Sequence, residues 1–123
     1  YDGSDFKVLS EQHIGSGHPS VNEDSTYLLA DTYPKQKWVA HPKGEIPIRL
    51  LDLNTDEEQM ICSIATDVGN DWQAYKKENP GSPYKLDPHP VWSRDYNRVC
   101  FNGAPDGERQ VFIADLTDIL CFA

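Results

Sequence analysis

The chain has 123 residues, of which 38 % are hydrophobic and 25 % are charged. This length allows one domain of ordinary size, and the apolar content is too high for an intrinsically disordered chain. A formal charge of −9 opposes binding to nucleic-acid phosphates and to anionic lipid, and no apolar run approaches the roughly 20 residues of a membrane-spanning helix. We therefore expect a soluble protein, cytoplasmic or periplasmic, that binds neither nucleic acid nor membrane. The sequence leaves the compartment open.

Short apolar segments between turn residues predict β-strands along the chain. The first is Phe6–Ser10, which follows the turn residues Asp2, Gly3 and Ser4, and we interpret residues 1–12 as the last strand of a preceding unit. Residues 13–66 hold the first complete unit. Its four predicted strands are Pro19–Asn22, Thr26–Asp31, Ile48–Leu53 and Gln59–Ala65.

A long polar segment, residues 67–86, is predicted to be an insertion between this unit and a second one. Within it, Asp71–Glu78 predicts a short helix that ends at Asn79-Pro80-Gly81. Residues 87–123 form the second unit. Its predicted strands are Pro90–Ser93, Arg98–Asn102, Gln110–Leu116 and Ile119–Phe122.

The two units are copies of one pattern. At one constant offset along the chain, His18-Pro19 corresponds to His89-Pro90, and Asp24 corresponds to Asp95. In each copy an apolar strand, a loop and a second apolar strand closing in Asp-Leu follow. Only the loop differs in length, as expected for a structural repeat. Four-stranded antiparallel units in series predict an all-β fold made of β-propeller blades, with about two blades in this chain.

Two blades cannot close a ring, because each blade of a propeller buries its faces against its neighbours. The chain begins with Tyr1, and we expect it to be a piece of a longer propeller or to assemble from several copies. Its expected partners are therefore the remaining blades of a parent chain, or further copies of itself.

The segment from His89 to Leu116 resembles the TolB-type, WD-repeat-like propeller repeat. That repeat has a short strand ending in Trp-Ser, a turn with Asp, an apolar strand, an Asp-Gly loop and a last strand ending in Asp-Leu. Tyr96 stands where the turn usually has Gly. The resemblance covers both copies and implies a propeller. The residues that carry it are Trp92-Ser93, Asp95, Asp106-Gly107 and Asp115-Leu116.

The two His-Pro pairs are similar to those of oligogalacturonate lyases, which are seven-bladed propellers that hold manganese with histidines near the central channel. This resemblance implies His18 and His89 as metal ligands, and Asp87 as a third in place of a histidine of the family pattern. Tyr84 replaces the family's Gln ligand, and the catalytic-base histidine of the family would precede Tyr1. The implied activity is metal-assisted β-elimination on acidic oligosaccharides, with manganese as the cofactor and no activity from this chain alone.

The expected blade topology puts the candidate metal ligands and one long loop at the same end of the molecule. The start of the first strand and the loop between the second and third strands share one end of an antiparallel blade, so His18, Asp87 and His89 share an end with the loop Thr32–Pro47. Cations and an aromatic ring there suit an anionic sugar, and imidazole with carboxylate suits manganese, zinc or iron. The candidate substrate-binding residues are Lys35, Lys37, Trp38, His41 and Arg109.

Each of these residues also has a structural interpretation. Proline fixes the entry into a strand, and the preceding histidine can tie the turn between two units by a hydrogen bond. Asp87 before a proline, and Asp31 and Asn102 at matched strand ends, are typical turn residues. The alternative functions are a non-catalytic TolB-type propeller module for protein or glycan binding, and an accessory propeller of a larger hydrolase.

Overall fold

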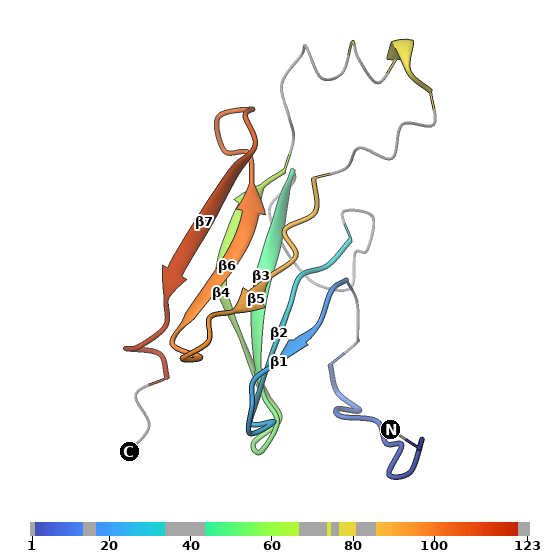
Figure 1. Cartoon of the computed structure of the whole chain (residues 1–123), viewed down its shortest axis with the longest axis vertical. Helices are drawn as coiled ribbons and strands as arrows, with labels where there is room; N and C mark the ends of the chain where they lie inside the picture. The colour runs from blue at the N-terminus through green and yellow to red at the C-terminus, as the bar shows by residue number, and fades with distance from the viewer. Residues whose placement is uncertain are drawn as a thin grey trace.

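The computed structural model describes residues 2–13, 17–33, 44–66, 74, 77–80 and 86–120. Within these ranges the chain forms two antiparallel sheets that lie side by side (Figure 1). The first sheet has the strand order β1-β2-β3-β4, and the second has the order β5-β6-β7. The strands are β1 (Ser20–Val21), β2 (Tyr27–Ala30), β3 (Glu45–Asp52), β4 (Glu57–Ala65), β5 (Val91–Trp92), β6 (Arg98–Gly103) and β7 (Gln110–Asp115).

The second sheet repeats the strand register of the first. Ser20 pairs with Leu29, and Leu29 pairs with Leu50 across β1, β2 and β3. The matching positions of the second sheet pair in the same way, Val91 with Cys100 and Cys100 with Ile113. The pattern of apolar residues sets this register, because a slip of one residue would turn every side chain to the opposite face.

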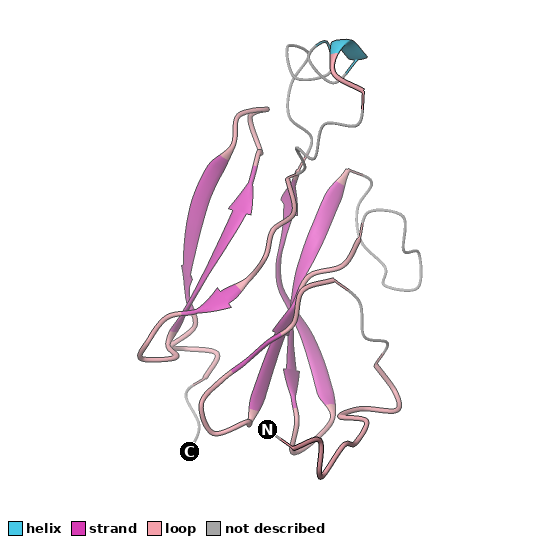
Figure 2. Ribbon diagram, turned by 45° about the vertical axis from the view of Figure 1, so that its right-hand side comes forward, coloured by secondary structure: helices cyan, strands magenta, loops and turns pink. Residues whose placement is uncertain are grey.

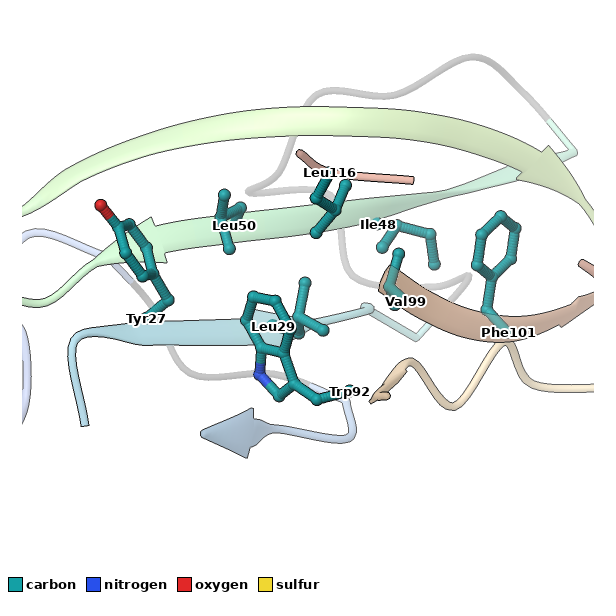
Figure 3. Packing of buried hydrophobic residues seen from close by; sticks show 8 residues of the cluster. All are labelled: Tyr27, Leu29, Ile48, Leu50, Trp92, Val99, Phe101 and Leu116. Atoms are coloured by element: carbon teal, nitrogen blue, oxygen red, sulfur yellow. The ribbon is translucent and has the colours of Figure 1, made fainter. Parts of the chain in front are cut away.

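The two sheets pack against each other through one apolar cluster (Figure 3). Leu29 and Ile48 of the first sheet are fully buried in it. The indole of Trp92 reaches across the sheets, and its Nε1–H donates to the Ser20 carbonyl at 3.0 Å, which brings β5 beside β1. The cluster consists of Tyr27, Leu29, Ile48, Leu50, Trp92, Val99, Phe101 and Leu116.

The second sheet carries an apolar face on the side away from this cluster. Leu50 is 2 % exposed in the first sheet, whereas Ile113, at the matching position of the second sheet, is 69 % exposed. Val111 and Val91 on the same sheet are 66 % and 51 % exposed. We call Val91, Val111 and Ile113 the outer strip.

The structure confirms an all-β fold of antiparallel sheets, and each predicted strand from Pro19–Asn22 to Gln110–Leu116 overlaps an observed strand. β3 begins earlier than predicted, at Glu45, and β4 begins at Glu57. In the predicted insertion, the described residues Ala74, Lys77 and Glu78 are helical (Figure 2). The rest of the predicted helix lies outside the described residues.

The predicted strand Phe6–Ser10 is wrong. No strand forms between residues 2 and 13, and the Phe6 side chain is 94 % exposed. A strand needs a neighbour for its backbone hydrogen bonds, and none of the described strands pairs with this segment. A side chain fastens it instead: His13 Nε2–H donates to the Asp56 carbonyl at 2.9 Å, and His13 Nδ1 lies 3.5 Å from Glu58 Oε2.

The predicted strand Ile119–Phe122 is wrong in its described part. Residues 117–119 form a turn, because the Leu116 carbonyl accepts the N–H groups of both Ile119 and Leu120, at 2.9 and 2.7 Å. Hydrogen bonds back to one carbonyl coil the chain and prevent it from extending beside β7. Cys121 and Phe122 lie outside the described residues.

Aspartates hold the turn between the first two strands of each unit. Asp24 Oδ1 accepts the Thr26 N–H at 3.0 Å. Asp95 Oδ1 accepts the Ser93 hydroxyl at 2.5 Å and the Asn97 N–H at 3.3 Å. The side chain and then the backbone N–H of Thr26 lower the pKa of Asp24 from its usual value, and the Ser93 hydroxyl and then the Asn97 N–H lower the pKa of Asp95. The repeat therefore conserves turn chemistry as well as strand register between its two copies.

The turn aspartates predict a specific acid sensitivity. Their folded-state pKa is depressed, so ionisation stabilises the fold above the unfolded-state pKa, and this contribution is lost as the pH falls through the folded-state pKa. We expect the unfolding temperature of the double variant Asp24→Asn, Asp95→Asn to fall less between about pH 5 and pH 2 than that of the unaltered chain. Circular dichroism would follow the transition.

The control for this experiment is Asp118→Asn, an exposed position outside both turns. Its unfolding temperature should follow that of the unaltered chain across the same pH range. Parallel curves for the double variant and the unaltered chain would contradict the role assigned to the two turns.

Candidate metal centre

The two His-Pro pairs meet at the entry to β1 and β5. His18 and His89 each stand two residues before the strand that opens their sheet. Their imidazole rings stack, with centroids 3.5 Å apart and an angle of 23° between the ring planes. Two residues far apart in the sequence are therefore in direct contact, at the place where the two sheets adjoin.

Asp87 completes a group of three potential ligands with His18 and His89. Each residue offers one nitrogen or oxygen atom, and these atoms all lie within 4.8 Å of one another. Donors bound at about 2.1 Å to one metal ion are separated by at most about 4.2 Å. Small rotations of these side chains would therefore bring all three ligand atoms within bonding distance of one divalent cation. Two imidazoles with a carboxylate are a donor set that fits manganese, zinc or iron.

Asp31, directly after β2, is the acceptor that holds both histidines. Its side chain is fully buried. Oδ1 accepts the His18 backbone N–H at 2.7 Å, and Oδ2 accepts the His89 backbone N–H at 3.0 Å. One carboxylate thus fixes the start of the first unit and the start of the second. Its two oxygens serve different units.

The same carboxylate contacts the His18 ring. His18 Nδ1 lies 3.1 Å from Asp31 Oδ2 and 3.2 Å from Oδ1. An ionised carboxylate can only accept hydrogen bonds, so Nδ1 must carry the proton. In a neutral imidazole this leaves the lone pair on Nε2. A carboxylate on one ring nitrogen and a metal on the other is the usual arrangement around histidine ligands.

Gly17 makes room for this arrangement. Its φ is +73°, and a Cβ built on it would collide with Asp31 Oδ1 and lie 2.7 Å from the Asp31 carbonyl oxygen. A residue with a side chain would therefore push the carboxylate away from His18. Glycine also adopts this left-handed conformation without strain.

Asn102 positions the other half of the site. It is the counterpart of Asp31 in the second copy, and its backbone N–H donates to the Pro88 carbonyl at 2.8 Å. Its side-chain Nδ2 lies 3.4 Å from the Asp87 carbonyl. The segment that carries Asp87 and His89 is therefore fastened to the end of β6, with Pro88 buried between them.

The site is partly exposed to solvent. Asp87 is half-buried and His89 is exposed, while the His18 side chain is 26 % exposed. Tyr33 covers His18 edge-on, with ring centroids 5.5 Å apart. Solvent access is what a metal needs if it is also to bind a substrate or water.

The structure places only one of the predicted substrate-binding residues. Arg109 is exposed in the loop between β6 and β7, at the end of the second sheet where Asn102 contacts Pro88. It therefore lies at the same end of that sheet as Asp87 and His89. Lys35, Lys37, Trp38 and His41 lie outside the described residues.

The prediction of Asp31 and Asn102 as turn residues is wrong. Asp31 accepts bonds from two units, and Asn102 holds the approach to β5. Two features of the sequence bear on Asp31: it is a carboxylate where the other copy has an amide, and the residue before His18 has no side chain. Neither feature reveals the partner, because the partners are largely backbone N–H groups.

Among the described residues, no helix is long and apolar enough to cross a membrane. A comparison of the chain with protein-family models gives no match, and neither does a comparison with curated proteins. The function has to be argued from the fold and from the geometry around His18, Asp87 and His89.

Proposed function

We propose that the chain forms two neighbouring blades of a β-propeller which bind one divalent metal ion through His18, Asp87 and His89. We further propose that the protein resembles oligogalacturonate lyases and acts on acidic oligosaccharides by metal-assisted β-elimination. The observation that carries the proposal is the convergence of three potential ligands within 4.8 Å at the matched strand entries of two repeated sheets.

The repeated register supports the propeller part of the proposal. Blades of a propeller are equivalent sheets that stack face to face about one axis. The pairing of Leu29 with Leu50 recurs as that of Cys100 with Ile113, and the apolar cluster joins unlike faces of the two sheets. The outer strip matches the first-sheet face that is buried in this cluster. A third blade covering the outer strip would continue the series.

The second sheet has three strands among the described residues, whereas the first has four. β7 is therefore an edge strand whose free backbone groups can accept a neighbour. A strand from another part of a longer protein, or from a second copy, would complete this blade. This requirement supports the expectation that the chain works as part of a larger ring.

The carboxylate on His18 supports the metal part of the proposal. Asp31 holds the proton on Nδ1, so Nε2 is the atom that would bind the ion. A divalent ion at this place would stabilise the negative charge that develops when a proton leaves the carbon next to a uronate carboxylate. Arg109 at the same end of the second sheet would pair with a carboxylate of the sugar.

We propose no residue of this chain as the general base for the elimination. The resemblance implies a histidine base, and no residue of this chain matches its position in the family pattern. We therefore expect no unsaturated product, measured by its ultraviolet absorbance, when this chain alone is mixed with oligogalacturonate.

One observation favours the alternative of a non-catalytic binding module. Asp31 joins the backbone N–H groups of His18 and His89 without needing any metal. The stacked histidines would then serve to fasten two blades, and the open end would bind a protein or a glycan. This alternative predicts that the chain binds no divalent ion.

Titration with Mn²⁺ separates the two functions. We expect the unaltered chain to bind one Mn²⁺ ion, measured from the loss of the electron paramagnetic resonance signal of free Mn²⁺. The double variant His18→Ala, His89→Ala should lose this binding, because two of three ligands are removed. His13→Ala is the matched control, since His13 contacts the turn between β3 and β4 and should leave binding unchanged.

Two outcomes would count against the metal centre. If the unaltered chain leaves the Mn²⁺ signal intact, the non-catalytic module is favoured. If the double variant binds Mn²⁺ as tightly as the unaltered chain, the ion binds elsewhere and the ligand assignment is wrong.

A further inference from the structure

We infer that Asp31 is a positioning residue of the metal centre, which selects the His18 tautomer that offers Nε2 and sets the position of His18 relative to His89. This inference rests on the proposed metal site. It adds a residue that binds neither the ion nor the substrate but acts through both histidines.

The first argument concerns the proton on His18. A neutral imidazole in water exchanges between two tautomers, and only one of them leaves Nε2 unprotonated. Asp31 is fully buried, so water cannot take its place beside Nδ1. Its oxygens at 3.1 and 3.2 Å from Nδ1 can only accept. The ring is therefore held in the metal-ready tautomer and in one orientation before any ion arrives.

The second argument concerns the distance between the two histidines. Asp31 Oδ1 holds the His18 backbone, and Oδ2 holds the His89 backbone. Because both bonds end on one rigid carboxylate, the two residues cannot move apart without breaking one of them. With the two backbones held in this way, the rings stack with centroids 3.5 Å apart. Binding of a metal and packing of the two sheets are thereby coupled through one side chain.

The third argument is that asparagine cannot replace this carboxylate. Asparagine has the same shape but only one oxygen, and its other terminal atom is a donor. In either orientation its NH₂ group faces one of the two backbone N–H groups. His18 Nδ1 lies 3.2 Å and 3.1 Å from the two terminal positions, so in the variant an oxygen acceptor and an NH₂ donor would compete for it. The ring would then no longer be held in the one tautomer that leaves Nε2 free.

The test compares Asp31→Asn with Asp52→Asn in the full chain. Asp52 is the matched control, because it is also an aspartate at a strand end of the first sheet and accepts backbone N–H groups, those of Asn54 and Thr55. It pairs with Tyr27 at the start of β2, whereas Asp31 follows the end of that strand. Two quantities are measured: the His18 tautomer in the metal-free protein, by long-range ¹H–¹⁵N NMR, and the affinity for Mn²⁺.

We expect the unaltered chain and Asp52→Asn to show His18 protonated on Nδ1. In Asp31→Asn a population of His18 with its proton on Nε2 should appear, and Mn²⁺ should bind about 10- to 100-fold more weakly. A purely structural role for Asp31 would lower stability without changing the tautomer. The inference is overturned if metal-free His18 carries its proton on Nε2 in the unaltered chain, or if Asp31→Asn keeps either the tautomer or the affinity of the unaltered chain.

The two readouts keep this inference separate from the metal site itself. If the unaltered chain binds no Mn²⁺, the proposed function fails together with the role of Asp31 at that site. If the unaltered chain binds Mn²⁺ and Asp31→Asn binds it equally well, only the inference fails. If Asp31→Asn does not fold, the His18 tautomer of the unaltered chain decides the question alone.

Discussion

Replacing Leu50 with alanine is expected to lower the free energy of unfolding by about 2–5 kcal/mol, the usual cost of truncating a fully buried leucine. Leu50 is 2 % exposed and lies in the cluster between the two sheets. The reason for the large loss is that the facing sheet is held by its own strand register and cannot collapse into the space left behind. Urea denaturation followed by tryptophan fluorescence measures the loss.

The repeat supplies a matched control for Leu50. Ile113 occupies the same register position in the second sheet, opposite Cys100 as Leu50 is opposite Leu29, but it is 69 % exposed. Ile113→Ala should change the free energy of unfolding by no more than about 0.5 kcal/mol in the isolated chain. Equal losses of unfolding free energy for the two variants would contradict the conclusion that Leu50 is buried between the sheets while Ile113 lies outside their contact.

Replacing Gly17 with alanine is expected to damage both the fold and the metal centre. A residue with a side chain at φ +73° costs about 1–2 kcal/mol in backbone strain. The new Cβ would also displace the Asp31 carboxylate, and each backbone N–H that loses its acceptor costs about 1–3 kcal/mol more. With one N–H group losing its acceptor, we expect a total loss of about 2–5 kcal/mol, together with weaker binding of Mn²⁺.

Gly44 allows the two costs to be separated. It has φ +82°, and a Cβ built there would meet no atom within 4 Å. Gly44→Ala therefore pays the backbone strain without disturbing Asp31, and its affinity for Mn²⁺ should stay unchanged. If Gly17→Ala were no more destabilising than Gly44→Ala and bound Mn²⁺ normally, the close approach of Gly17 to Asp31 would have no energetic importance.

The repeat was the most informative feature of the sequence. The offset that takes His18 to His89 also takes the first two predicted strands of the first unit to those of the second, and the structure pairs these strands at matching residues. The expected positions of the strand entries put His18, His89 and Asp87 at one end of the two units, and in the structure potential ligand atoms of all three lie within 4.8 Å of one another. These predictions succeeded where structure follows from local pattern and from equivalence between copies.

The predictions that failed depend on partners that the local sequence does not encode. Phe6–Ser10 has a strand-like alternation, but no described strand pairs with it. Aspartate at a strand end is typical of turns. Asp31 instead joins the two units, because two segments far apart in the sequence present backbone N–H groups to its carboxylate. Every residue except proline has such a group, so the sequence carries no signal for this contact.

The outer strip has a consequence for how isolated chains would associate. The corresponding surface on the far side of the first sheet carries Val21, which is 42 % exposed, and the half-buried Leu28, at the matching positions of Trp92 and Val99. Contacts between these two unlike surfaces would join chains head-to-tail. Such addition stops only if the rotation between successive chains closes a circle, and otherwise it continues into filaments. The concentration of free chain would then decide whether single molecules, closed circles or polymers are observed.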